Sequence, residues 1–143
     1  MPKLFKKILC PIQFDDNSIA ALDQACELAH ESDATLYVMN VVFLPLAALE
    51  PRPDMSEQPS RHALEKLARE RLHGKVRYEL LVRTGKPAEI INQIAEQLGV
   101  DLIVMATHGR TGVSHLFLGS VAERVIRTAK PPVLTIRPAH NLG

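Results

Sequence analysis

The chain has 143 residues, of which 46% are hydrophobic and 23% charged, and its formal net charge is +1. This length and composition predict one globular domain with a sizeable core and exclude wholesale disorder. The balanced charge predicts no nucleic-acid partner. Apolar runs are too short for a membrane span or an export signal, so we expect a cytoplasmic protein that does not contact membranes.

The N-terminal part predicts a strand, a helix and a second strand. Residues 7–12 form a short apolar run, and residues 18–31 carry apolar side chains at helical spacing after a polar start. Residues 34–42 are rich in β-branched and apolar residues, as in a strand. Cys10 and Cys26 lie within these apolar segments and lack CxxC spacing. We therefore expect two buried thiols, with no metal or redox role.

The middle of the chain begins with a proline-rich stretch. Proline lacks an amide donor, so residues 44–59 predict a loop, and Ser60 is expected to cap the helix that follows. Gly74 is placed to end that helix. A third strand is expected over residues 76–82.

The C-terminal part continues the alternation of strands and helices. A turn at residues 85–87 precedes a helix that Gly99 is placed to end, and residues 101–105 predict a strand covered on both faces. Ser120 opens the last helix, and a final strand is expected at 133–136. The side chains expected on the inner face of the last helix are Val121, Val125, Ile126 and Ala129.

Alternating strands and helices predict an α/β fold with a mostly parallel sheet and helices on both faces. In such sheets ligands bind at the carboxyl ends of the strands, where the strand order reverses. The segments that follow the first and fourth strands, residues 11–13 and 105–120, are therefore the candidate site.

The segment after the fourth strand is suited to phosphate. Gly109 and Gly119 would let backbone amides approach phosphate oxygens, and Ser120 stands where a helix N-terminus offers unpaired amides. The glycines taken singly are also compatible with simple turns, and Ser120 with a simple N-cap. Their joint placement after a buried strand favours phosphate binding.

Two further side chains flank Gly109. Arg110 is equally compatible with a phosphate contact and with a solvated loop, and His108 is expected to be structural because no nucleophile is evident beside it. The other histidines have no metal-ligand spacing, so we expect no metal site and no catalytic residue. A dinucleotide motif after the first strand, a Walker loop and the acceptor aspartate of a receiver domain are all missing.

The spacing of this segment resembles the universal stress protein family. ATP-binding members carry G-x2-G-x9-G-[ST] after the fourth strand, and here the pattern runs from Ala106 through Gly109 to Gly119-Ser120. Residues 7–12, 85–87 and 132–134 are also similar to the family. The resemblance covers nearly the whole chain, with Ala106 in place of the first glycine and Gln13 in place of the family's usual aspartate.

The resemblance implies an open five-stranded parallel sheet of order 3-2-1-4-5. It implies a binding site for ATP, with or without Mg²⁺, or for AMP or another adenine nucleotide, with adenine near residues 11–13. The residues expected at the site are Pro11, Ile12, Gln13, Val41, Met105, Ala106, His108, Gly109, Arg110, Gly119, Ser120 and Val121.

The resemblance also implies a homodimer joined through the last strand, and dimers could pair into tetramers. The residues expected at the interface are Val133, Leu134, Thr135, Ile136 and Arg137. The expected function is a stress-response module that binds nucleotide without rapid hydrolysis and acts on an unidentified protein partner. The alternatives are a dimeric protein-interaction module that binds no nucleotide, and a slow ATPase.

Overall fold

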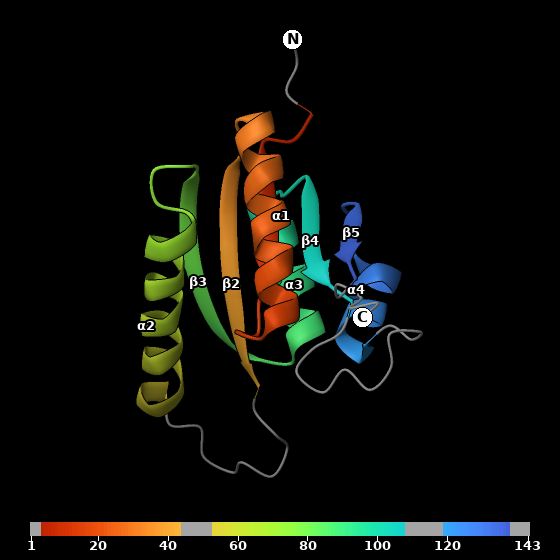
Figure 1. Cartoon of the computed structure of the whole chain (residues 1–143). Coiled ribbons are helices and arrows are strands. Elements are labelled where there is room, and N and C mark those ends of the chain that lie inside the picture. The colour runs from red at the N-terminus through yellow and green to blue at the C-terminus, as the bar shows by residue number, and fades with distance from the viewer. Residues whose placement is uncertain (1–3, 44–52, 108–118, 138–143) are drawn as a thin grey trace, which may run out of the picture.

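The computed structural model describes residues 4–43, 53–107 and 119–137, with side chains from residue 57 onward in the second range. Within them, strands and helices alternate along the chain (Figure 1). The strands are β1 (Lys7–Pro11), β2 (Thr35–Phe43), β3 (Arg77–Gly85), β4 (Leu102–Ala106) and β5 (Val133–Ile136). The helices are α1 (Asp16–Ser32), α2 (Pro53–Arg71), α3 (Pro87–Leu98) and α4 (Ser120–Thr128).

The strands form one parallel sheet of order β3-β2-β1-β4-β5, which confirms the predicted fold. The register pairs Ile8 with Leu36 on one side and with Leu102 on the other, so β1 occupies the centre. The chain crosses from β3 to β4 through α3, and the strand order reverses between β1 and β4. This reversal creates the place where α/β sheets bind ligands.

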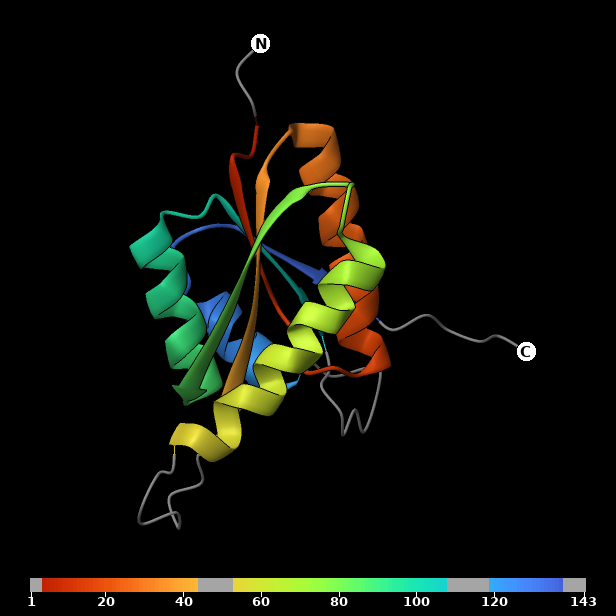
Figure 2. The ribbon, with the colours of Figure 1, turned by 90° about the vertical axis from the view of Figure 1, so that its left-hand side faces the viewer.

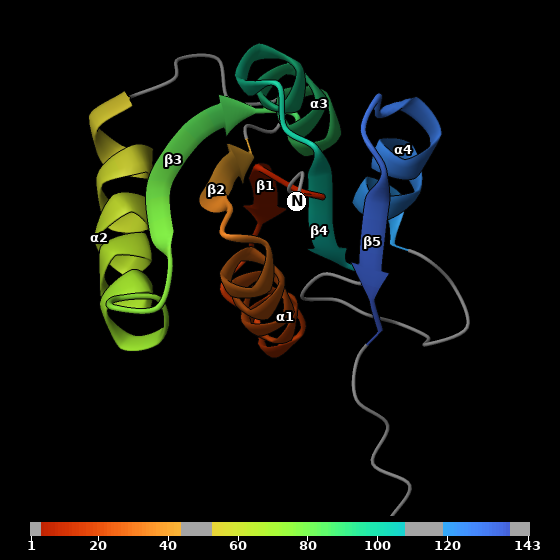
Figure 3. The same ribbon diagram turned by 90° about the horizontal axis from the view of Figure 1, so that it is seen from above.

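Two hydrophobic layers cover the sheet. One joins α1 and α2 to the sheet and contains Ile8, Leu36 and Leu64, whereas the other joins α3 and α4 and contains Leu9, Met39 and Ile103. Figures 2 and 3 show the two helix pairs on opposite faces. Neighbouring residues of β1 and β2 enter different layers, as side-chain alternation along a strand requires. Both faces of the central strands are thus buried, which explains their continuous apolar sequence.

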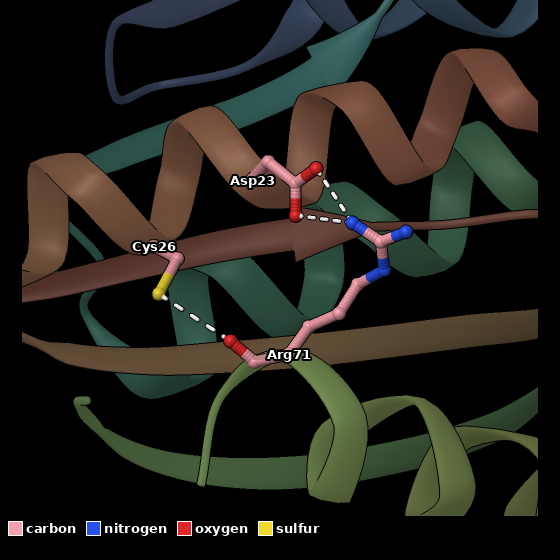
Figure 4. A network of polar contacts seen from close by, with 3 residues as sticks. All are labelled: Asp23, Cys26 and Arg71. Carbon is pink, nitrogen blue, oxygen red and sulfur yellow. Dashed lines mark hydrogen bonds and ion pairs between the residues drawn. The ribbon is translucent and has the colours of Figure 1, made fainter. Parts of the chain in front are cut away.

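Both cysteines are buried, as predicted, Cys10 in β1 and Cys26 in α1. Burial raises the pKa of both thiols above the ordinary value of 9.0, because the charged form loses its hydration. At the surface beside Cys26, Asp23 of α1 forms an ion pair with Arg71 at the end of α2 (Figure 4). The pair links the two helices of one layer.

The predicted loop over residues 44–59 is wrong in its second half, because α2 already begins at Pro53 and includes Pro59. Proline removes one intrahelical hydrogen bond, but bonds to the sheet hold this part of the helix in place. Thr84 of β3 donates a 2.8 Å hydrogen bond to Glu57, and Ser60 donates one of 2.7 Å to Asn40 of β2. Ser60 therefore lies inside the helix and does not cap it.

One expectation for the last helix is confirmed and one is wrong. The helix α4 begins at Ser120, as predicted, and Gly119 is its N-cap residue. Ile126 was expected to face the core but is 43% exposed, because Ala122 and Val125 take the buried positions. The strand boundaries shift slightly as well, with β3 running on to Gly85.

Candidate functional site at the carboxyl edge of the sheet

The turn after β1 is held by backbone and side-chain hydrogen bonds on both sides. The amide of Ile12 donates to the carbonyl of Met39 at 2.8 Å, and the side-chain amide of Asn40 donates to the carbonyl of Ile12, also at 2.8 Å. The amide of Gln13 donates to the hydroxyl of Ser18 at 3.1 Å. These bonds fix the backbone where β1 leaves the sheet.

The start of α1 is equally well defined. Asp15 is the N-cap residue, its carboxylate accepts from the amide and hydroxyl of Ser18, and its own amide donates back to that hydroxyl. The two residues form a reciprocal capping box. Phe14, between this cap and Gln13, has φ of 61°, a left-handed conformation that is costly for a bulky residue. Such strain persists only where the surroundings impose it, as the capping box does here.

One carboxylate oxygen of Asp15 is buried without a hydrogen-bond partner in the described part of the chain. Because the other oxygen accepts from Ser18, the carboxylate is anchored and still has acceptor capacity left. The carboxylate of Asp15 is therefore a fixed acceptor group shortly after the end of β1.

At the carboxyl end of β4, a short backbone hydrogen bond joins the strand to the start of α4. The amide of Gly119 donates to the carbonyl of Thr107 at 2.6 Å, and the amide of Thr107 donates to the carbonyl of Ile136 at 3.0 Å. The first bond brings the start of α4 against the end of β4. Among the described residues no side chain caps this helix, so its first amides are available as donors within this part of the chain. A helix N-terminus with open amides beside a strand end is suited to phosphate.

Buried polar residues gather at this edge of the sheet. Of the residues that the structure describes, four polar ones are buried, and each takes part in a hydrogen bond at this edge. They are Ser18, Asn40, Ser60 and Thr107. Polar burial is costly unless it is satisfied, and here the satisfied groups fix the backbone of the candidate site.

The structure brings most of the predicted site residues to this one edge. The end of β1 supplies Pro11, Ile12 and Gln13, β2 supplies Val41, β4 supplies Met105 and Ala106, and α4 begins with Gly119, Ser120 and Val121. The side chains of Ile12 and Met105 are in the core, so only their backbone can meet a ligand. His108, Gly109 and Arg110 lie outside the described residues.

Sequence reasoning missed Ser18, Asn40 and Ser60 as parts of this edge. A signal for Ser18 existed, because Asp15 followed by Ser18 has the spacing of a capping pair. Asn40 was visible as a polar residue within an apolar strand. Ser60 had no such signal, since its contact with Asn40 depends on how α2 packs on the sheet.

A separate surface pocket of about 310 Å³ lies at the amino ends of β2 and β3. It is lined by His30, Asp33, Lys75 and Arg77 together with small and apolar residues. Asp33 pairs with Arg77, and His30 contacts the backbone of Lys75. This pocket is distinct from the carboxyl edge. In the described ranges, no group of three acidic, histidine or cysteine side chains could hold a metal ion, and no helix could cross a membrane.

The fold and this edge together define a doubly wound α/β protein with an open helix N-terminus at the point where the strand order reverses. More specifically, the chain belongs to the universal stress protein family, whose family model matches residues 4–137. This membership confirms the resemblance seen in the sequence.

Individual relatives agree with this assignment. Universal stress protein MJ0531 of Methanocaldococcus jannaschii is 37% identical over 141 residues, with 94% of this chain and 83% of the relative covered. The structure of MJ0577, a universal stress protein of the same organism, superposes with a TM-score of 0.83 at 25% identity, covering 96% of this chain and 99% of that one. An Archaeoglobus fulgidus family member in complex with dAMP has a TM-score of 0.65 at 25% identity, covering 94% and 99%.

Proposed function

We propose that this chain is a stress-response module that binds an adenine nucleotide, ATP in the first place, at the carboxyl edge of β1, β2 and β4. The observation that carries the proposal is the open N-terminus of α4, held against the end of β4 by the bond from Gly119 to Thr107. The dAMP complex of the Archaeoglobus fulgidus relative supports an adenine nucleotide as the ligand class.

In the proposed arrangement the phosphates lie at the first amides of α4, next to Gly119, Ser120 and Val121. The base lies at the carboxyl ends of β1 and β2, near Gln13 and Val41. Where Mg²⁺ accompanies ATP, the phosphates and water would supply most of its ligands. His108, Gly109 and Arg110 are proposed to complete the phosphate side.

Isothermal calorimetry with ATP and AMP, with and without Mg²⁺, tests the proposal. Gly119→Val should lower ATP affinity at least about tenfold, because a branched side chain would stand among the phosphate-binding amides. The backbone of Gly119 is extended, with φ of −67°, so valine meets no backbone strain at this position. Ala129→Val is the matched control, since Ala129 has the same extended conformation at the other end of α4. Equal ATP affinity in Gly119→Val and the wild type would contradict this site.

We propose that the protein acts through the bound nucleotide itself and does not hydrolyse it rapidly. Fast phosphoryl transfer needs metal and cation neutralisation and a group that positions water. The described part of the site offers backbone amides and a carboxylate that is already engaged as a helix cap. A phosphate-release assay with Mg²⁺ should show turnover well below about one per second, the low end of ordinary enzymes. Sustained turnover near that rate would favour the ATPase alternative.

The proposed assembly is a homodimer through β5, the terminal strand of the sheet. One edge of β5 pairs with β4, and Leu134 is 40% exposed. A terminal strand with exposed apolar side chains is a ready surface for pairing with a second chain. The proposed interface consists of Val133, Leu134, Thr135, Ile136 and Arg137. Tetramers and an unidentified protein partner would build on this dimer.

A further inference from the structure

The surface pocket at the amino ends of β2 and β3 lies at the opposite end of the sheet from the candidate nucleotide site. The strands run parallel and the helices return against them, so α1 ends near the turn from α2 into β3 (Figure 1). Ala29, Ala34 and Gly74 line the pocket, and none of them has a side chain large enough to fill it. Its volume of about 310 Å³ is at the lower end of the range for small-molecule sites. The pocket therefore has room for a small ligand.

Backbone amides cap the helix ends beside the pocket. At the end of α1, the amides of Asp33 and Ala34 donate to the carbonyl of Ala29. At the end of α2, the amide of Lys75 donates to the carbonyl of Leu72 at 3.0 Å. Basic side chains are common near helix C-termini because they bond the last carbonyls. Here backbone amides supply those bonds, so capping does not account for the side chain of Lys75.

The guanidinium of Arg77 is held in place at one side of the pocket. Its Nη1 donates to the carboxylate of Asp33 at 3.0 Å, and its Nη2 donates to the main-chain carbonyl of Asp33 at 2.8 Å. A guanidinium has five N–H donors, so three remain without a partner in the described part of the chain. Its planar fork matches the oxygens of a carboxylate or a phosphate. Arg77 is therefore an oriented donor for an anionic ligand.

Lys75 and His30 supply the other polar groups of the pocket. The ammonium of Lys75 makes no hydrogen bond or ion pair to a described residue. Burial raises the pKa of the Cys26 thiol, and the positive charge of Lys75 opposes this rise, so the ammonium lies on the side of α1. Nδ1 of His30 lies 3.2 Å from the carbonyl of Lys75 and must donate to it, because a carbonyl only accepts. On the neutral ring Nε2 is then left as an acceptor, which suits a hydroxyl group of a ligand.

We propose that this pocket is a second ligand site, which binds a phosphate group, free or carried by a small molecule, through Lys75 and Arg77. An ammonium supplies a point charge and a guanidinium a fork, and the two together favour a dianion over a monoanion. Asp33 is the acidic residue among those that line the pocket, and its carboxylate pairs with Arg77. The proposal is independent of the proposed nucleotide site, which lies at the other end of the strands.

Titration of the ¹⁵N-labelled protein by NMR, at constant ionic strength, tests the proposal with inorganic phosphate, glycerol 3-phosphate and acetate. The amide of Gly74 reports on the pocket, and the amide of Gly119 reports on the start of α4. Inorganic phosphate and glycerol 3-phosphate should give saturable shifts at Gly74, and acetate should bind at least about fivefold more weakly. Tighter binding of glycerol 3-phosphate would identify a phosphorylated small molecule as the ligand, and equal binding would identify free phosphate.

Three variants and a control separate the pocket from general charge effects. Lys75→Gln and Arg77→Gln should each weaken phosphate at least about fivefold. Asp33→Asn removes the acidic charge and should tighten phosphate about threefold, a gain that unfolding could not produce. Asp33 has φ of 55°, a conformation that asparagine tolerates well. Lys66→Gln removes the same charge from an exposed position on α2 outside the pocket and should change nothing.

Several results would overturn the proposal. Shifts that appear at Gly119 but not at Gly74 would place the phosphate at the start of α4 and leave the pocket without a ligand. Acetate that binds as tightly as phosphate would show that the pocket does not select a dianion. Equal weakening by Lys66→Gln and Lys75→Gln, or weaker binding in Asp33→Asn, would mean that the lining residues do not hold the anion. None of these results would change the binding of ATP at the carboxyl edge.

Discussion

Ser60 on α2 donates a 2.7 Å hydrogen bond to the side-chain oxygen of Asn40 on β2, and both residues are less than a tenth exposed. Because Asn40 uses its amide group to hold Ile12, its oxygen depends on Ser60. The first turns of α2 are thereby connected to the end of β1, the central strand. The side chains of Ser60 and Asn40 make this connection within the candidate site.

Ser60→Ala should lower the free energy of unfolding by about 1–3 kcal/mol, because it leaves the oxygen of Asn40 buried without a donor. Urea denaturation measures the loss. Thr128→Ala is the control, since it also removes a bonded hydroxyl but at an exposed position at the end of α4, where about 0.5 kcal/mol or less is expected. Equal stability losses in the two variants would contradict a special role for the buried bond.

Leu134→Lys should shift the proposed dimer to monomer. The side chain is 40% exposed on the terminal strand, so the folded monomer tolerates lysine there, while two lysines facing one another across an interface would repel. Light scattering at micromolar concentration gives the mass. Ile126→Lys is the matched control, because Ile126 is similarly exposed but lies on α4. A monomeric wild type, or a dimer that survives Leu134→Lys, would rule out this interface.

The sequence predicted the order of the elements and the edge of the sheet that carries the site, because both follow from periodic apolar patterns and strand alternation. It did not predict where α2 begins. Proline-rich composition favours a loop locally, but tertiary bonds from Glu57 and Ser60 to the sheet override that preference. Local propensity does not include contacts between residues that are distant in the chain.

The sequence also predicted only part of the candidate site. Strand ends and the start of a helix can be located from local patterns, so Gln13 and Gly119 were found. The residues that hold them, above all Asn40, act across strands, and their partners are known only once the packing is known. The start of the last helix at Ser120 was predicted correctly, but the backbone bond between Gly119 and Thr107, which holds this start against β4, could not be.

Gly85→Ala should destabilise the fold more than Gly99→Ala. Both glycines have positive φ, 150° and 65°, so each substitution meets backbone strain. A Cβ at Gly99 has no atom within 4 Å, whereas one at Gly85 would lie 3.1 Å from two carbons of Ile90. We expect about 1 kcal/mol at Gly99 and more at Gly85, measured by urea denaturation. Equal losses would show that Ile90 moves aside freely.

The buried thiol of Cys10 predicts a loss of stability at alkaline pH. Burial, and to a smaller extent Asp23, raises the pKa of Cys10 in the folded protein far above the ordinary 9.0. In the folded state the thiol keeps its proton, while in the unfolded state it ionises. Its contribution to the free energy of unfolding is therefore complete below pH 9 and is lost as the pH rises. One such thiol costs about 1.4 kcal/mol between pH 8 and pH 10.

Comparison of the wild type with Cys10→Ala isolates this effect, because all other titrating groups are common to both proteins. The variant should be less stable at pH 7, where it loses buried side-chain volume, and the gap should narrow by about 1.4 kcal/mol from pH 8 to pH 10. Urea denaturation under reducing conditions at several pH values measures it. A gap that stays constant with pH would mean that the thiol of Cys10 ionises as easily in the folded chain as in the unfolded one.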